Sequence, residues 1–169
     1  GYDRIIKAIS EFNKANEHKA YFEIIGGACE SPIIAQLKHL SIELDVGDYV
    51  TFAGFQNHDY ISQSYDKSDL AVGSLGLFRI GLNFSSILKI REYCLAGIPF
   101  ITAGQDPDFE ENPPFRFVVP NDESIAPIVK VLEDFSERRK TFTDEQIREY
   151  ALEHFSFDKK FDQMLEGLI

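Results

Sequence analysis

Short apolar runs alternate along this chain with longer amphipathic stretches. Five runs have the length and apolar character of strands: 20–27, 48–55, 70–76, 99–104 and 115–120. Other stretches carry apolar residues at helical spacing: 1–15, 31–46, 57–69, 122–135, 143–155 and 157–169. Short strands joined by helices require crossover connections, so the pattern predicts a parallel sheet covered by helices on both faces.

Residues that favour helix starts precede two of these helices. Ser31 is placed to cap one helix with Pro32 in its first turn, and Asn57 is placed to open the next. The face that we expect the first of these two helices to bury consists of Ile33, Ile34, Leu37, Leu40 and Leu44.

The first helix has a strongly apolar face made of Ile5, Ile6, Ile9 and Phe12. Such a face needs a sheet to cover, and no strand precedes it in the sequence. We therefore expect this sequence to be a fragment, with an earlier strand or a whole earlier domain outside it.

The composition favours one compact domain over residues 1–169, because 44% of the residues are hydrophobic and 13% are aromatic. A net charge of -11 disfavours binding to nucleic acid or to anionic lipid. With no apolar run near the ~20 residues of a membrane span and no signal peptide, we expect a soluble, cytosolic protein. Cys29 and Cys94 lack the spacing of a zinc site, and we expect both to be buried thiols.

Ligands of open parallel sheets bind beyond the carboxyl ends of the strands. Here those ends carry Gly26, Gly54, Gly76 and Gly104, which allow tight turns and close approach of a ligand, although glycine ends strands in many α/β proteins. The sequence contains neither GxGxxG nor GxxxxGK[ST], so the usual NAD and P-loop assignments lose their strongest support.

The stretch SSILKIREYCLAGIPFI carries the most specific candidate chemistry. A helix that begins near Ser85 or Ser86 would place Ser85, Lys89 and Glu92 on one side. Its N-terminus and Lys89 suit a diphosphate, and Glu92, roughly 10 Å further along, could accept both hydroxyls of a ribose. From spacing alone, an exposed pair of Lys89 with Glu92 on a solvated helix explains these residues equally well.

The same stretch resembles the nucleotide-sugar-binding segment of retaining glycosyltransferases of family 4 (group 1), which have the two-domain GT-B architecture. Glu92 lies five residues before Gly97, as the glutamate does in that family's "EAMACGxPVI" type of sequence. YFEIIGGACES, DYVTFAGFQNHDYISQSYDKSDLAVGSLG and FSFDKKFDQML resemble further family segments in the same order. The resemblance implies a Rossmann-like three-layer domain with a mainly parallel sheet, the C-terminal, donor-binding half of a GT-B fold.

Carried over by position, the resemblance implies roles for several residues. Glu92 would hold the ribose hydroxyls, and Gly54 and Phe55 would lie near the base. Gly26 and Gly27 would allow close approach on the diphosphate side. The backbone that would receive the diphosphate, together with Lys89 beside it, comprises Phe84, Ser85, Ser86, Ile87 and Leu88.

Two departures from the family pattern bear on catalysis. The first glutamate of the family's EX7E motif is replaced by Phe84, which cannot accept a hydrogen bond, so its role would fall to a neighbour such as Asn83. The family's basic residue that faces the diphosphate would precede Gly1, which leaves Arg79 and Lys89 as basic candidates. The sequence identifies no catalytic residue.

The resemblance implies transfer of a sugar, with retention, from a nucleoside-diphosphate sugar to an acceptor hydroxyl in glycan or polysaccharide biosynthesis. No metal or other cofactor is required. The acceptor, a glycan or a lipid-linked one, would bind through the missing N-terminal domain, so we expect the fragment alone to be inactive. Peripheral attachment to the inner membrane through that domain stays open. Phe84 favours an alternative, a non-catalytic binding module of glycosyltransferase type, and a nucleotide-sugar epimerase is a weaker one.

Overall fold

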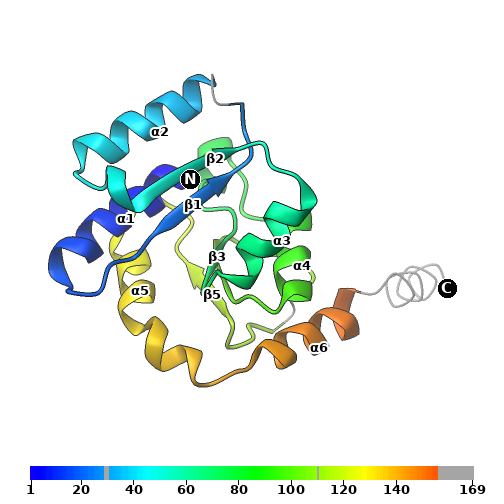
Figure 1. The fold of residues 1–169 in the computed structure, drawn as a ribbon. Helices are drawn as coiled ribbons and strands as arrows, with labels where there is room; N and C mark the ends of the chain where they lie inside the picture. Colours follow the sequence, from blue (N-terminus) through cyan, green and yellow to red (C-terminus); the bar gives the residue numbers. More distant parts are fainter. Residues whose placement is uncertain (29–30, 110, 156–169) are drawn as a thin grey trace.

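The computed structural model describes residues 1–28, 31–109 and 111–155 (Figure 1). Within them the elements follow the order α1 (Tyr2–Ala15), β1 (Phe22–Ile25), α2 (Pro32–Glu43), η1 (Gly47–Tyr49), β2 (Val50–Gly54), α3 (His58–Asp66), β3 (Ala71–Val72), η2 (Leu77–Ile80), α4 (Leu88–Ala96), β4 (Phe100–Ala103), β5 (Arg116–Val119), α5 (Ala126–Arg139) and α6 (Asp144–Phe155). The five predicted strands are all present. The helix predicted over 157–169 lies outside the described residues.

The predicted helix starts at α2 and α3 are confirmed in position. Asn57 caps α3 because its side-chain oxygen accepts a hydrogen bond from the Tyr60 N–H at 2.9 Å. Ser31 occupies the N-cap of α2 without a side-chain bond, and Pro32 takes the first helical position.

The predicted apolar face of α2 is wrong at one residue. Ile34 and Leu37 are buried, whereas Ile33 is 65% exposed. Neighbouring residues point about 100° apart around a helix, so α2 cannot turn both isoleucines toward the same sheet.

Helices lie in two layers around the strands (Figure 1). On one side α1 contacts both α2 and α5, and on the other side α4 contacts both α3 and α6. All strand pairs are parallel, as predicted. The α/β prediction is therefore confirmed, with helices on both faces of parallel sheets.

The strands form two sheets where the sequence pattern predicted one. One sheet pairs β1 with β2, and the other has the order β3–β4–β5. Neither β1 nor β3 has a partner among the described strands on the edge that the other sheet would occupy. A single sheet would need β1 and β3 to be neighbours, and a cavity separates them.

The core is densest around β4, whose four residues are all buried. Phe100 and Ile101 of this strand pack with Phe117 of β5 and with Ile90 and Cys94 of α4 in one cluster. Burial raises the pKa of the Cys94 thiol to about 12, so this group stays protonated at neutral pH. The prediction of a buried thiol is confirmed for Cys94, and Cys29 lies outside the described residues.

Two arginines fasten α1 to the loops that follow β3 and β5. The buried Arg4 guanidinium donates hydrogen bonds to the carbonyl oxygens of Leu75 at 2.7 Å and of Ser124 at 2.6 Å. Arg79 donates two bonds of 2.8 Å to Asp3 and also pairs with Glu123. The start of α1 is thereby held at the carboxyl end of β3.

The Asp3 pair should make stability depend on pH in the acid range. The hydrogen bonds from Arg79 lower the pKa of Asp3 to about 2, from a model value of 3.8. A lowered folded-state pKa contributes stability above pH ~4, and this contribution disappears as the pH falls toward 2. We expect Asp3→Asn to lower the free energy of unfolding by about 1 kcal/mol at pH 6 and by almost nothing near pH 2.

Urea unfolding of both proteins at several pH values measures this difference. Asp134→Asn is the matched control, because Asp134 forms only an exposed pair with Lys130 one helical turn away. A loss of stability on Asp3→Asn that is the same at pH 6 and pH 2 would contradict the assignment.

Candidate functional site

The loops after β1 and β2 bring two predicted residues together. The Gly26 N–H donates a hydrogen bond to the Gly54 carbonyl oxygen at 2.7 Å. Gly26 has φ 100, in the left-handed region that disfavours residues with a side chain, and no atom lies within 4 Å of the position a Cβ would take. Gly27 follows Gly26, and Phe55 follows Gly54 with 78% of its surface exposed.

A second group of predicted residues lies beside the end of β4. Phe84 forms a parallel bridge with Gln105, and the Ser85 N–H donates to the Gln105 carbonyl at 2.9 Å. Gly104 allows this approach, because a Cβ there would lie 2.8 Å from the Asn83 carbonyl oxygen. Residues 83–85 therefore extend the edge of the sheet.

The helix of the candidate site begins later than predicted. α4 starts at Leu88 with Ile87 as its N-cap, and no side chain caps it. The prediction of a start near Ser85 or Ser86 is wrong, because the strand-like pairing of residues 83–85 with Gln105 holds Ser85 in an extended conformation. The predicted ridge of three polar residues is thus reduced to Lys89 and Glu92.

The start of α4 nevertheless offers free donors. Within the described part of the chain, the N–H groups of Leu88 and Lys89 have no hydrogen-bond partner, as is usual in the first turn of a helix. Leu88 itself is 75% exposed, so this turn faces solvent. Backbone donors and the partial positive charge of a helix N-terminus together favour an anion.

Arg91 fixes the approach to α4 from inside the domain. Its guanidinium pairs with Asp106 through two hydrogen bonds and also pairs with Asp108. The same group donates to the Ser86 hydroxyl at 3.1 Å and to the Ile87 carbonyl at 3.3 Å. Arg91 is thus the link between the segment before α4 and the loop after β4.

Glu92 lies on the exposed side of α4. Its carboxylate accepts a hydrogen bond of 3.3 Å from the Tyr65 hydroxyl of α3. Burial raises the pKa of Tyr65 to about 12, and the charge of Glu92 raises it further, so the tyrosine remains a donor at neutral pH. The second carboxylate oxygen and the remaining lone pairs stay available for a ligand.

The two basic candidates differ in availability. Arg79 is occupied by Asp3 and Glu123. Lys89 lies over the Tyr2 ring with its Nζ 5.6 Å from the ring centroid. Among the described residues no ion pair joins Lys89 to Glu92, although the spacing allowed one. Lys89 is therefore the better placed cation for an anionic ligand.

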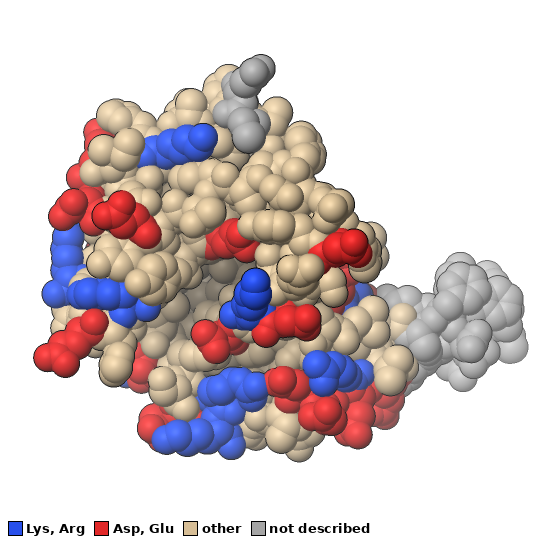
Figure 2. Space-filling view, viewed as in Figure 1, with Lys and Arg blue, Asp and Glu red and all other residues tan. Residues whose placement is uncertain are grey.

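Acidic and basic side chains are interspersed on the face that Figure 2 shows, without a continuous basic surface. No group of three or more His, Cys, Asp or Glu side chains in residues 1–28, 31–109 and 111–155 is arranged to hold a metal ion. No helix in the same residues combines the length and apolarity needed to cross a membrane.

Sequence reasoning missed Arg91, Asp106 and Tyr65. Arg91 falls on the buried side of a helix, where a long charged residue signals a paired group. The acidic residues of the loop after β4 were the available indication of its partner. The Tyr65 contact with Glu92 depends on how α3 packs against α4, which sequence spacing does not reveal.

Comparison with known proteins places this geometry. Residues 1–83 match the family model "Glycosyl transferases group 1". A search of curated proteins found no match.

Solved structures of glycosyltransferases share the fold. WaaG, a glycosyltransferase involved in lipopolysaccharide biosynthesis, is 20% identical with a TM-score of 0.70, over 89% of this chain and 39% of that one. Sucrose-phosphate synthase from Thermosynechococcus elongatus is 18% identical with a TM-score of 0.69, over 99% and 42%. Anabaena HepE in complex with UDP and glucose is 19% identical with a TM-score of 0.66, over 99% and 44%.

These likenesses confirm the fold, an α/β domain with parallel sheets like those in GT-B glycosyltransferases. The chain spans about two fifths of the length of the solved structures that it resembles.

Loss of Arg91 should destabilise the domain strongly. Replacing it with leucine would leave the buried carboxylate of Asp106 without its partner, and breaking a buried pair costs about 3–5 kcal/mol. Chemical denaturation of Arg91→Leu measures the loss. Arg139→Leu removes a partly exposed pair with Asp144 and should cost at most about 1 kcal/mol. Equal losses in the two variants would show that the Arg91 cluster does not anchor the fold.

Proposed function

We propose that this chain is the C-terminal, donor-binding domain of a retaining family 4 glycosyltransferase and lacks the N-terminal acceptor domain. The full-length protein would transfer a sugar from a nucleoside-diphosphate sugar to an acceptor hydroxyl of a glycan, without a required metal. The match of residues 1–83 to group 1 glycosyltransferases carries the proposal. The geometry of α4 adds support, because it combines free N–H donors with an exposed carboxylate further along one helix.

The diphosphate would bind the first turn of α4 at Leu88 and Lys89, with the ammonium of Lys89 adding charge. Glu92 lies four residues beyond Leu88, about 6 Å along the helix axis, which is shorter than the sequence pattern suggested. A nucleoside diphosphate can span this distance between its phosphates and its ribose hydroxyls. The Tyr65 hydroxyl would hold the carboxylate in place while the ribose donates to it.

The second candidate function is a binding module that takes up a nucleotide sugar without transferring it. Phe84 favours it, because an apolar, 62% exposed side chain stands where the family has its first glutamate. Asn83, the neighbour that could substitute, already accepts a hydrogen bond from Asn121 at 2.9 Å. Transfer or hydrolysis of a donor by the full-length protein distinguishes the two functions.

The 169-residue chain should bind a nucleoside diphosphate without turning over a sugar donor. Calorimetry with UDP, GDP, ADP and dTDP tests binding, and an assay of sugar release from the matching donor tests turnover. The free donors of α4 predict binding, and the absence of an acceptor domain predicts no transfer. A folded protein that binds none of the four nucleotides would contradict the proposal.

Glu92→Gln should weaken nucleoside diphosphate binding by roughly tenfold to a hundredfold, because a charge-assisted hydrogen bond contributes about 1.5–3 kcal/mol. The fold should survive, since the side chain is exposed. Glu11→Gln, at an exposed position of α1, is the matched control and should leave affinity unchanged.

A 2',3'-dideoxy nucleotide completes the test. It should bind the native protein weakly and respond little to Glu92→Gln, because the hydroxyls that the carboxylate accepts from are already missing. If the substitution weakens ribose and dideoxyribose ligands equally, Glu92 does not bind the ribose.

A further inference from the structure

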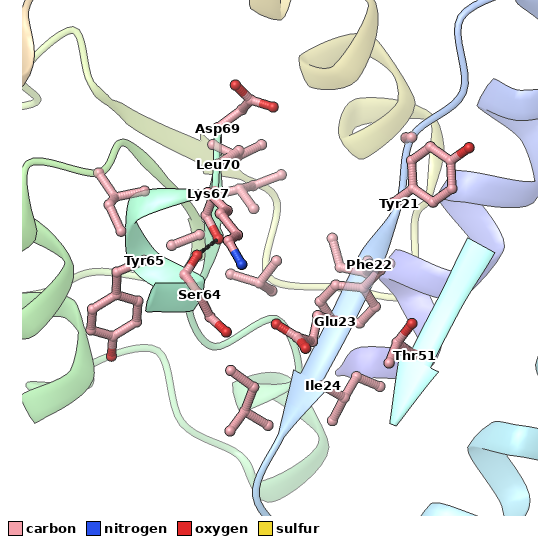
Figure 3. A pocket seen from close by; sticks show the side chains of 18 of the residues that line it. Tyr21, Phe22, Glu23, Ile24, Thr51, Ser64, Tyr65, Lys67, Asp69 and Leu70 are labelled. Carbon is pink, nitrogen blue, oxygen red and sulfur yellow. Dashed lines mark hydrogen bonds between the residues drawn. The ribbon is translucent and has the colours of Figure 1, made fainter. Parts of the chain in front are cut away.

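A cavity of about 950 Å³ separates the two sheets. It lies between the unpaired edges of β1 and β3, and Figure 3 shows Phe22 and Glu23 of β1 on one side and Ser64 and Leu70 on the other. The face in Figure 2 is hollowed near its centre, over the space between the same strands in Figure 1.

The walls of this cavity are those of an interior layer. On the α1 and α5 side it is lined by Ile5, Ile9, Leu132 and Phe135, and α3 and α4 supply Ile61, Tyr65 and Tyr93 on the other side. Phe22, Leu70, Val72 and Phe135 are only partly buried, although they pack against the core. Apolar side chains on both faces are the surroundings of a central strand in a parallel sheet.

The edge of β3 presents a free donor to the cavity. The N–H groups of Ala71 and Gly73 donate to β4, to Pro99 and Ile101, each at 2.8 Å. Successive N–H groups of a strand point to opposite sides, so the N–H of Val72 points away from β4 and toward the cavity. Among the described residues it has no partner. A buried, unpaired N–H group is rare in native structures.

The size of the cavity fits one strand. A strand occupies about 4.8 Å between its neighbours and about 10 Å between packed layers, and it advances about 3.3 Å per residue. The cavity therefore has room for an extended segment of about six residues.

The position of Gly1 determines the direction of such a segment. A Cβ on Gly1 would lie 2.6 Å from the Leu75 carbonyl carbon and 2.7 Å from the Gly76 nitrogen, so Gly1 lies just past the carboxyl end of β3. Polypeptide that reaches Gly1 through the cavity must leave it at this end. It would run parallel to β3 and then turn back into α1, which is the usual strand-to-helix connection.

We propose that an extended strand of about six apolar residues, supplied by polypeptide that leads into Gly1, fills this cavity parallel to β3 and joins the five described strands into one sheet. The solved structures with this fold are more than twice as long as this chain, which is consistent with further polypeptide. The inference rests on the cavity and on the strand edges, and it is independent of nucleotide binding.

The test adds a strand to the 169-residue chain. One version carries Thr-Val-Ile-Val-Ile-Thr joined to Gly1 through a short Gly/Ser linker. The matched control carries Thr-Pro-Ile-Pro-Ile-Thr, because proline removes the donors that a central strand needs. Amide hydrogen exchange by NMR follows Val72, with Gly73 as the internal reference, since its N–H is already bonded to Ile101.

The strand version should slow exchange of the Val72 amide at least a hundredfold and raise the thermal midpoint, and the proline version should do neither. Equal Val72 exchange in both versions would overturn the proposal. Protection of Val72 that rises with protein concentration, together with a dimer in sedimentation, would also overturn it and assign the cavity to a second copy. Protection in a monomer that is specific to the strand version supports the strand.

Discussion

The unpaired edges of β1 and β3 are the constraint on which the rest of the architecture depends. Parallel strands are stable when buried on both faces and paired on both edges, and the helices here already cover both faces. The chain thus builds two halves of a sheet and the layers for a whole one. Arg4 holds α1 at the end of β3, so the shape of the cavity persists without a strand inside it.

The candidate site depends on a second, local interaction. Arg91 collects Ser86, Asp106 and Asp108 around one buried guanidinium, and it thereby sets where the segment before α4 ends and where the helix begins. The free donors of α4 are therefore positioned by a charge cluster that contacts no solvent-facing part of the proposed ligand site. Such a residue acts on binding through geometry, in contrast to Glu92.

The elements were predictable because each depends on local pattern: the alternation of short apolar runs with amphipathic stretches identifies β1 to β5, and Asn57 identifies the start of α3. The start of α4 was not predictable, because the pairing of Phe84 with Gln105, residues far apart in the sequence, overrides the helix preference of the segment. The split of the sheet depends on which strands become neighbours, and spacing along the chain contains no such information. Among the candidate site residues, type and order were readable, and their partners, such as Tyr65 for Glu92, were not.

The two proposals are linked through the arrangement of the sheets. Gly26 and Gly54 belong to the β1–β2 sheet, whereas the segment from Phe84 to Glu92 adjoins the β3–β4–β5 sheet. A ligand that contacts both groups, as proposed, binds best when the two sheets keep one relative position, and a strand between them would impose that position. Because linkage is reciprocal, the ligand would then also stabilise the joined sheet, by the same free energy with which the strand strengthens binding. Nucleotide affinity and completion of the sheet are in this sense one property of the domain, measured from two sides.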